Sequence, residues 1–177
     1  RGLGDVYKRQ GYIKNCYSSA TVIDQIANNT GKAGGIIGRV NGNASGSSIE
    51  NCYTSGDINA IGGGNAGGIV GKVDGGKLVI KNCIAWNSML VSTDKAKVGR
   101  IVGGTANATY ENCYAYDGMI LKAGEATFTV SDETSPSGSS FQGVAKSANE
   151  LKNTVINWDS SLWKEGGNGY PVFKWSK

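Results

Sequence analysis

The apolar positions of the chain fall in short segments that glycine, asparagine and serine separate. These segments are rich in isoleucine and valine, as in Ile36-Ile37 and Val79-Ile80. Short β-branched segments bounded by turn residues are typical of strands, and they do not show the 3.6-residue period of a helix. No apolar run approaches the ~18 residues that a membrane-spanning helix requires. The pattern therefore predicts an all-β chain without direct membrane insertion.

The segments recur with a fixed spacing, which identifies an internal repeat. One unit has the form I-x-N-C-Y, and its cysteines are 36, 31 and 30 residues apart. Its four copies begin at Ile13, Ile49, Ile80 and Tyr110. A second unit, A-G-G-I-[IV]-G, alternates with the first and begins at Ala33, Ala66 and, in a variant form, Val98. Because the two units share one period, we take the repeat to be about 30 residues long.

A repeat of this length cannot bury its own apolar face, but stacked copies form a continuous core and pair their strands along the axis. The sequence therefore predicts a parallel β-helix, or β-solenoid, over residues 11–130. The asparagine of each unit follows a predicted strand, at a turn where this residue tolerates left-handed backbone. We expect a hydrogen-bonded ladder of asparagines along the axis. Its members are Asn15, Asn51, Asn82 and Asn112.

The cysteines could form two disulfides, a metal site or a stacked column. Spacings near 30 residues differ from the C-x₂-C pairs of zinc sites, and aligned parallel side chains rarely reach the crossed geometry of a disulfide. We expect a buried column of free thiols that pack as small hydrophobic groups.

Three tyrosines occupy the repeat position that follows the cysteine, namely Tyr17, Tyr53 and Tyr114. If they point outward, they form an aromatic stripe that contacts sugar rings or a protein partner. If they point inward, they belong to the core. The turn at the preceding asparagine resets the strand alternation, so the sequence leaves both orientations open.

The composition changes after the repeats. Residues 131–146 are rich in serine and contain Pro136, which predicts an exposed loop. Residues 147–177 hold three of the four tryptophans, and Ser147-x-x-Glu150 has the form of a helix capping box. We predict that this segment caps the open end of the solenoid, because an uncovered edge strand promotes aggregation.

The first ten residues need a separate interpretation. The segment Asp5–Gln10 is the translation of GAT GTG TAT AAG AGA CAG, which resembles the transposon end used to prepare sequencing libraries. We therefore expect residues 1–10 to be non-native and exclude them from the fold.

Composition and charge narrow the function classes. The chain has no histidine, so it holds no Ser-His-Asp triad, Cys-His dyad or histidine-ligated zinc site. Its formal net charge is +4 without a run of lysine or arginine, which gives no signature for nucleic acid. Glycine-rich matches at 62–67 and 71–77 lack the flanking helix or the Ser/Thr of nucleotide-binding loops. We predict no catalytic, cofactor-binding or metal-binding residues, and no enzyme activity within these residues.

The two units together resemble the GLUG repeat over roughly residues 11–122, although Ile84, Arg100 and Tyr110 depart from the pattern. The resemblance implies a β-helical scaffold in large bacterial surface and secreted proteins, including regions beside immunoglobulin A-directed metallopeptidase domains. It implies an extracellular location and neighbouring repeats or domains of the same parent chain.

Three hypotheses for function stay open. The first is a non-catalytic scaffold, stalk or adhesion surface that contacts a host or cell-surface protein or glycan. The second is an accessory region of a large secreted enzyme, a metallopeptidase or a polysaccharide-degrading protein, whose active site lies elsewhere. The third is a self-contained polysaccharide-active β-helix. It would require carboxylates or basic residues to converge on one face.

Overall fold

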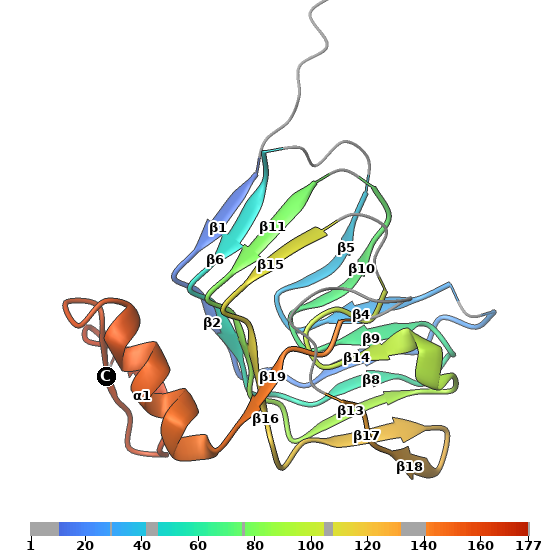
Figure 1. Cartoon of the computed structure of the whole chain (residues 1–177). Coiled ribbons are helices and arrows are strands. Elements are labelled where there is room, and N and C mark those ends of the chain that lie inside the picture. Colours follow the sequence, from blue (N-terminus) through green and yellow to red (C-terminus); the bar gives the residue numbers. More distant parts are fainter. Residues whose placement is uncertain are drawn as a thin grey trace, which may run out of the picture.

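The computed structural model describes residues 11–28, 30–41, 46–75, 77–104, 108–131 and 141–176 (Figure 1). The predicted non-native segment 1–10, and residues 132–140 of the predicted exposed loop, lie outside these ranges.

The described strands form a parallel β-solenoid, which confirms the predicted fold. Sheet 1 contains β1 (Tyr12–Lys14), β6 (Ser48–Glu50), β11 (Leu78–Lys81) and β15 (Ala108–Glu111). Sheet 2 contains β2 (Tyr17–Ser18), β7 (Tyr53–Thr54), β12 (Ile84–Ala85), β16 (Tyr114–Tyr116) and β19 (Val144–Lys146). Sheet 3 contains β3 (Val22–Asp24), β8 (Ile58–Ala60), β13 (Met89–Ser92), β17 (Ile120–Ala123) and the antiparallel β18 (Ala126–Phe128). Sheet 4 contains β4 (Lys32–Gly34), β9 (Asn65–Gly67) and β14 (Val98–Gly99), and sheet 5 contains β5 (Ile37–Val40) and β10 (Val70–Val73).

The repeat units align in space as they align in the sequence. Ile13 pairs with Ile49, Ile49 with Ile80, and Ile80 with Tyr110 along sheet 1. Sheets 1 and 5 enclose one part of the core, which is formed mainly by isoleucine, valine and cysteine. Sheets 3 and 4 enclose a second part, which includes Leu90. Each turn of the solenoid, called a rung below, therefore contributes equivalent residues to a continuous core.

The asparagine ladder is confirmed. The four asparagines have left-handed backbone with φ between 50° and 53°. Each Nδ2 donates to the Oδ1 of the preceding rung, at 3.2 Å from Asn51 to Asn15, 3.0 Å from Asn82 to Asn51 and 3.2 Å from Asn112 to Asn82. Asparagine adopts this backbone at less cost than other side chains, so it turns the chain from sheet 1 to sheet 2 in every rung.

The four cysteines form the predicted column of free thiols. Cys52, Cys83 and Cys113 are buried, whereas Cys16 in the first described rung is half-buried. Burial raises the pKa of the Cys83 thiol, and it raises the pKa of Cys113 to about 12. Both thiols therefore stay protonated at neutral pH.

The C-terminal segment covers a side of the solenoid rather than its end. Helix α1 (Ala148–Trp158) begins at the predicted capping box, in which the Ser147 N–H donates to Glu150 Oε2 at 2.9 Å. A hairpin of β20 (Trp163–Glu165) and β21 (Pro171–Phe173) follows it. Together they pack against sheet 2 through an apolar cluster, and Figure 1 shows α1 lying outside that sheet. The cluster joins Tyr53, Ile84 and Trp86 of the solenoid to Leu151, Val155 and Trp163.

Residues 126–131 and 141–146 cover the end of the solenoid instead. Strand β18 pairs with β17, β19 pairs with β16, and the ring of Phe141 stacks on Tyr110. The prediction of an exposed loop is therefore wrong over residues 141–146, where Phe141 is buried. Arg100, which departs from the repeat pattern, anchors this segment. Its guanidinium donates to the carbonyl oxygens of Gln142 and Gly143 at 3.0 and 2.6 Å.

A short 3₁₀ helix, η1 (Lys95–Lys97), precedes β14. No helix among the described residues is long and apolar enough to cross a membrane.

Candidate functional site

The tyrosine column points out of the solenoid and is covered by the chain's own C-terminal segment. Tyr17 stacks on Tyr53 with ring centroids 5.3 Å apart and an interplanar angle of 7°. Tyr53 is 1% exposed, and its hydroxyl donates to the carbonyl oxygen of Pro171. Tyr17 and Tyr114 are half-buried, and the Lys146 ammonium lies 3.7 Å from the centroid of the Tyr114 ring. A ligand-binding role for these tyrosines stays a prediction, since their partner in this structure is the chain itself.

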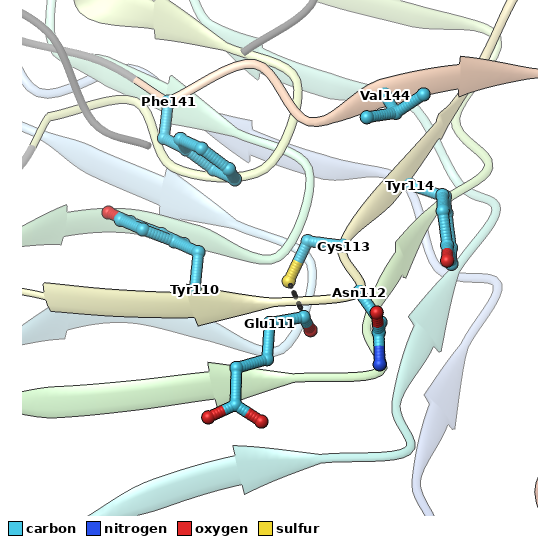
Figure 2. A pocket seen from close by; sticks show the side chains of 7 residues that line it. All are labelled: Tyr110, Glu111, Asn112, Cys113, Tyr114, Phe141 and Val144. Atoms are coloured by element: carbon cyan, nitrogen blue, oxygen red, sulfur yellow. Dashed lines mark hydrogen bonds between the residues drawn. The ribbon is translucent and has the colours of Figure 1, made fainter. Parts of the chain in front are cut away.

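A pocket of about 480 Å³ lies at the covered end of the solenoid (Figure 2). Strand β15 and the turn after it supply one wall, and the segment that crosses the last rung supplies the other. Figure 2 shows the rings of Tyr110 and Phe141 together on one side, with Tyr114 on the opposite side. The lining residues are Tyr110, Glu111, Asn112, Cys113, Tyr114, Phe141 and Val144.

The polar groups of this pocket are held by the repeat itself. The Glu111 carboxylate forms an ion pair with Lys81, in which Oε2 lies 3.0 Å from Nζ. The Cys113 thiol donates to the carbonyl oxygens of Ile80 and Glu111 at 3.4 and 3.5 Å. Asn112 is the last described member of the asparagine ladder.

The pocket is suited to binding more than to acid–base chemistry. Its lining includes one carboxylate, whereas glycoside hydrolysis normally uses a pair about 5–9.5 Å apart. The raised pKa of Cys113 keeps its thiol protonated and therefore a poor nucleophile. Across the described ranges no three histidine, cysteine, aspartate or glutamate side chains cluster closely enough to hold a metal ion.

A second candidate site was not predicted from the sequence. Four cations, Lys32, Arg39, Lys72 and Lys97, gather where sheets 4 and 5 meet. Arg39 and Lys72 form ion pairs with Asp74, and Lys72, Arg39 and Lys97 all lower the pKa of Lys32. These four cations span 66 residues of sequence, so no local run of basic residues marks them. Their signal lies in the repeat alignment, because Lys32 and Lys97 directly precede the A-G-G unit while Arg39 and Lys72 directly follow it.

Comparison with known proteins gives one informative likeness. No protein-family model matches the chain, and no curated protein matches it. The chain is similar to the crystal structure of a Bacteroides ovatus protein provisionally named an immunoglobulin A1 protease, with 48% sequence identity and a TM-score of 0.83. The similarity covers 94% of this chain and 48% of that protein, so the chain spans about half the length of the protein it matches.

Proposed function

We propose that this chain is a non-catalytic β-solenoid module of the GLUG type, from a bacterial cell-surface or secreted protein, and that it serves as a scaffold or adhesion surface. The observation that carries the proposal is the in-register stack of repeats, with its asparagine ladder and continuous core. The Bacteroides ovatus protein supports it, because 94% of this chain matches about half of that protein at 48% identity.

The side chains of the described pocket also support a non-catalytic role. One carboxylate, a protonated thiol and two stacked rings can hold a ligand, but they do not form a nucleophile–base pair. The side-chain amides of the repeated asparagines bond to one another along the ladder. The repeated residues therefore contribute to the stability of the fold and not to a catalytic site.

A second candidate is an accessory region of a large secreted enzyme. The provisional protease name of the Bacteroides ovatus protein favours it, since this chain corresponds to only about half of that protein. In this case the catalytic residues lie in another part of the parent protein, and the solenoid positions or extends that part.

Incubation with human immunoglobulin A1 tests the non-catalytic role. We expect the heavy chain to remain intact on a denaturing gel, while a known immunoglobulin A1 protease, as the control, yields heavy-chain fragments. Fragments produced by the purified chain would contradict the proposal.

Long-read sequencing of the source locus separates the two candidates. An export signal and a surface anchor in the same reading frame support the scaffold or adhesion role. A peptidase or hydrolase domain in that frame supports the accessory role instead, and a complete short frame without an export signal would refute the extracellular location.

A further inference from the structure

The corner between sheets 4 and 5 brings distant basic residues together because glycines allow the two sheets to touch. A Cβ atom added at Gly38 would lie 2.6 Å from the carbonyl oxygen of Lys32, and one added at Gly71 would lie 2.8 Å from that of Ala33. These glycines directly precede Arg39 and Lys72. The close approach therefore brings the backbones of β5 and β10 against β4, and Arg39 and Lys72 lie near enough to Lys32 to influence its charge.

Strand register adds cations from other rungs. Arg39 pairs with Lys72 along sheet 5, and Lys32 pairs with Asn65 along sheet 4. Lys97 occupies the equivalent position two rungs from Lys32, on the far side of Asn65, because Val98 and Ala33 both pair with Ala66. We call Lys32, Arg39, Lys72 and Lys97, together with Asp74, the basic corner.

The positive charges of the basic corner are only partly neutralised. Asp74 accepts both the Arg39 Nε and the Lys72 Nζ, the latter at 2.6 Å. The Lys32 and Lys97 ammonium groups contact backbone carbonyl oxygens, for example Thr30 O at 2.7 Å from Lys32 and Gly63 O at 3.0 Å from Lys97. Among the described residues, two of the four cations therefore form an ion pair with Asp74, and the other two contact backbone oxygens.

The neighbouring charges of the basic corner affect the pKa of Lys32. The pKa of Lys32 is lowered first by burial and next by the neighbouring Lys72, with smaller contributions from Arg39 and Lys97. Asp74 opposes this lowering, with an effect that ranks between those of Lys72 and Arg39. Asp24 also lies close, against Gly31, but its side chain is on the same face of β3 as Val22, which packs into the core.

Sheet 1 shows what an ordinary charged column of this solenoid looks like. Its column runs Lys14, Glu50, Lys81, Glu111, so the sign alternates from rung to rung. Lys14 and Glu50 form an ion pair at 2.9 Å, and Lys81 and Glu111 form one at 3.0 Å. The basic corner departs from this arrangement, because Arg39 pairs with Lys72 and the sign does not alternate. Like charges on adjacent strands repel and are destabilising. An anionic ligand would relieve that repulsion.

We propose that the basic corner binds the acid groups, carboxylate or sulfate, of an acidic polysaccharide. Rungs ~4.8 Å apart place Arg39 beside Lys72 and place Lys32 and Lys97 two rungs apart, so the cations extend along the solenoid axis and suit a linear polymer that carries several acid groups. None of the five residues that define the basic corner is aromatic, so recognition there rests on charge and not on the base stacking that single-stranded nucleic acid binding uses. The proposal names a ligand class for the adhesion surface proposed above and depends on that role only for its biological setting.

The test measures fluorescence anisotropy of labelled heparin, which carries sulfate, and of labelled polygalacturonate, which carries carboxylate, with the full chain at 50 mM and 150 mM salt. Neutral dextran and duplex DNA are the comparison polymers. The test variant is Arg39→Gln/Lys72→Gln. The matched control is Lys14→Gln/Lys81→Gln, which also removes two ion-paired cations but on sheet 1.

We expect the Arg39→Gln/Lys72→Gln variant to bind about tenfold more weakly than the wild type, with a shallower salt dependence. The sheet 1 control should stay within about twofold, and Asp74→Asn should bind about threefold more tightly because it removes the competing carboxylate. The arm with the larger loss identifies sulfate or carboxylate as the preferred acid group.

Three results would overturn the proposal. They are no binding to either acidic polymer, equal losses in the test and control variants, and equally tight, equally sensitive binding of duplex DNA. None of them bears on the scaffold role, which the immunoglobulin cleavage assay and the reading frame test separately. Circular dichroism of each variant establishes that lost binding does not arise from unfolding.

Discussion

Replacing Asn82 by alanine should destabilise the solenoid more than most exposed substitutions. Asn82 lies in the middle of the ladder, where it donates to Asn51 at 3.0 Å and accepts from Asn112 at 3.2 Å. Each of these hydrogen bonds contributes about 1 kcal/mol to the free energy of unfolding. Alanine also pays about 1 kcal/mol for left-handed backbone, since φ at this position is 50°. The expected loss is therefore about 3 kcal/mol, or roughly 6–12 °C in melting temperature for a chain of this size.

Two further variants separate the contributions of backbone and hydrogen bonds. Asn82→Gly removes the same two bonds but adopts left-handed backbone freely, so we expect a loss of about 2 kcal/mol. Asn112→Ala, at the last described position of the ladder, removes one bond and pays the same backbone cost, which also gives about 2 kcal/mol.

Urea denaturation followed by circular dichroism measures all three losses against the wild type. A loss below about 1 kcal/mol for Asn82→Ala would show that the ladder does not stabilise the fold. If Asn82→Gly were as destabilising as Asn82→Ala, the assigned cost of left-handed backbone would be wrong.

Two other predictions follow from burial and close packing. Cys83 and Cys113 should react with a thiol reagent at pH 8 only after denaturation, because both are buried and their pKa values are raised; rapid reaction in native buffer would contradict the buried column. Gly67→Ala should cost about 3 kcal/mol or prevent folding, because the new Cβ would overlap the carbonyl oxygen of Val70. Gly167→Ala, where no atom lies within 4 Å of the added Cβ, is its control and should melt within about 2 °C of the wild type.

The fold could be predicted from the sequence because the repeat makes each column visible. Isoleucine, asparagine and cysteine recur at fixed offsets, and a parallel solenoid is the arrangement that stacks them. The ladder and the thiol column follow from the same register. The orientation of Tyr53 did not follow, because the left-handed turn before it breaks the alternation of faces.

The C-terminal part could be predicted only in its local structure. The capping box marked the start of α1, since that motif depends on residues three apart. The surface that α1 covers depends on contacts with Ile84 and Trp86, which lie far away in the sequence. Likewise the burial of Phe141 could not be predicted, because in the sequence it follows a serine-rich stretch typical of an exposed loop. Arg100, which holds the neighbouring Gln142, was recognised in the sequence only as a departure from the repeat.

The basic corner shows how a repeat can carry a site that neither composition nor local motifs indicate. Aligning the units would place Lys32 with Lys97 and Arg39 with Lys72, but it would assign them to two separate columns. The columns become one site only because Gly38 and Gly71 let sheets 4 and 5 touch. Stability alone favours alternating signs, as in sheet 1, so a same-sign cluster that persists beside it represents a cost. Such local conflicts with the rest of the fold are expected where a surface binds a ligand, and this is why the basic corner, more than the tyrosine column, is the surface to test first.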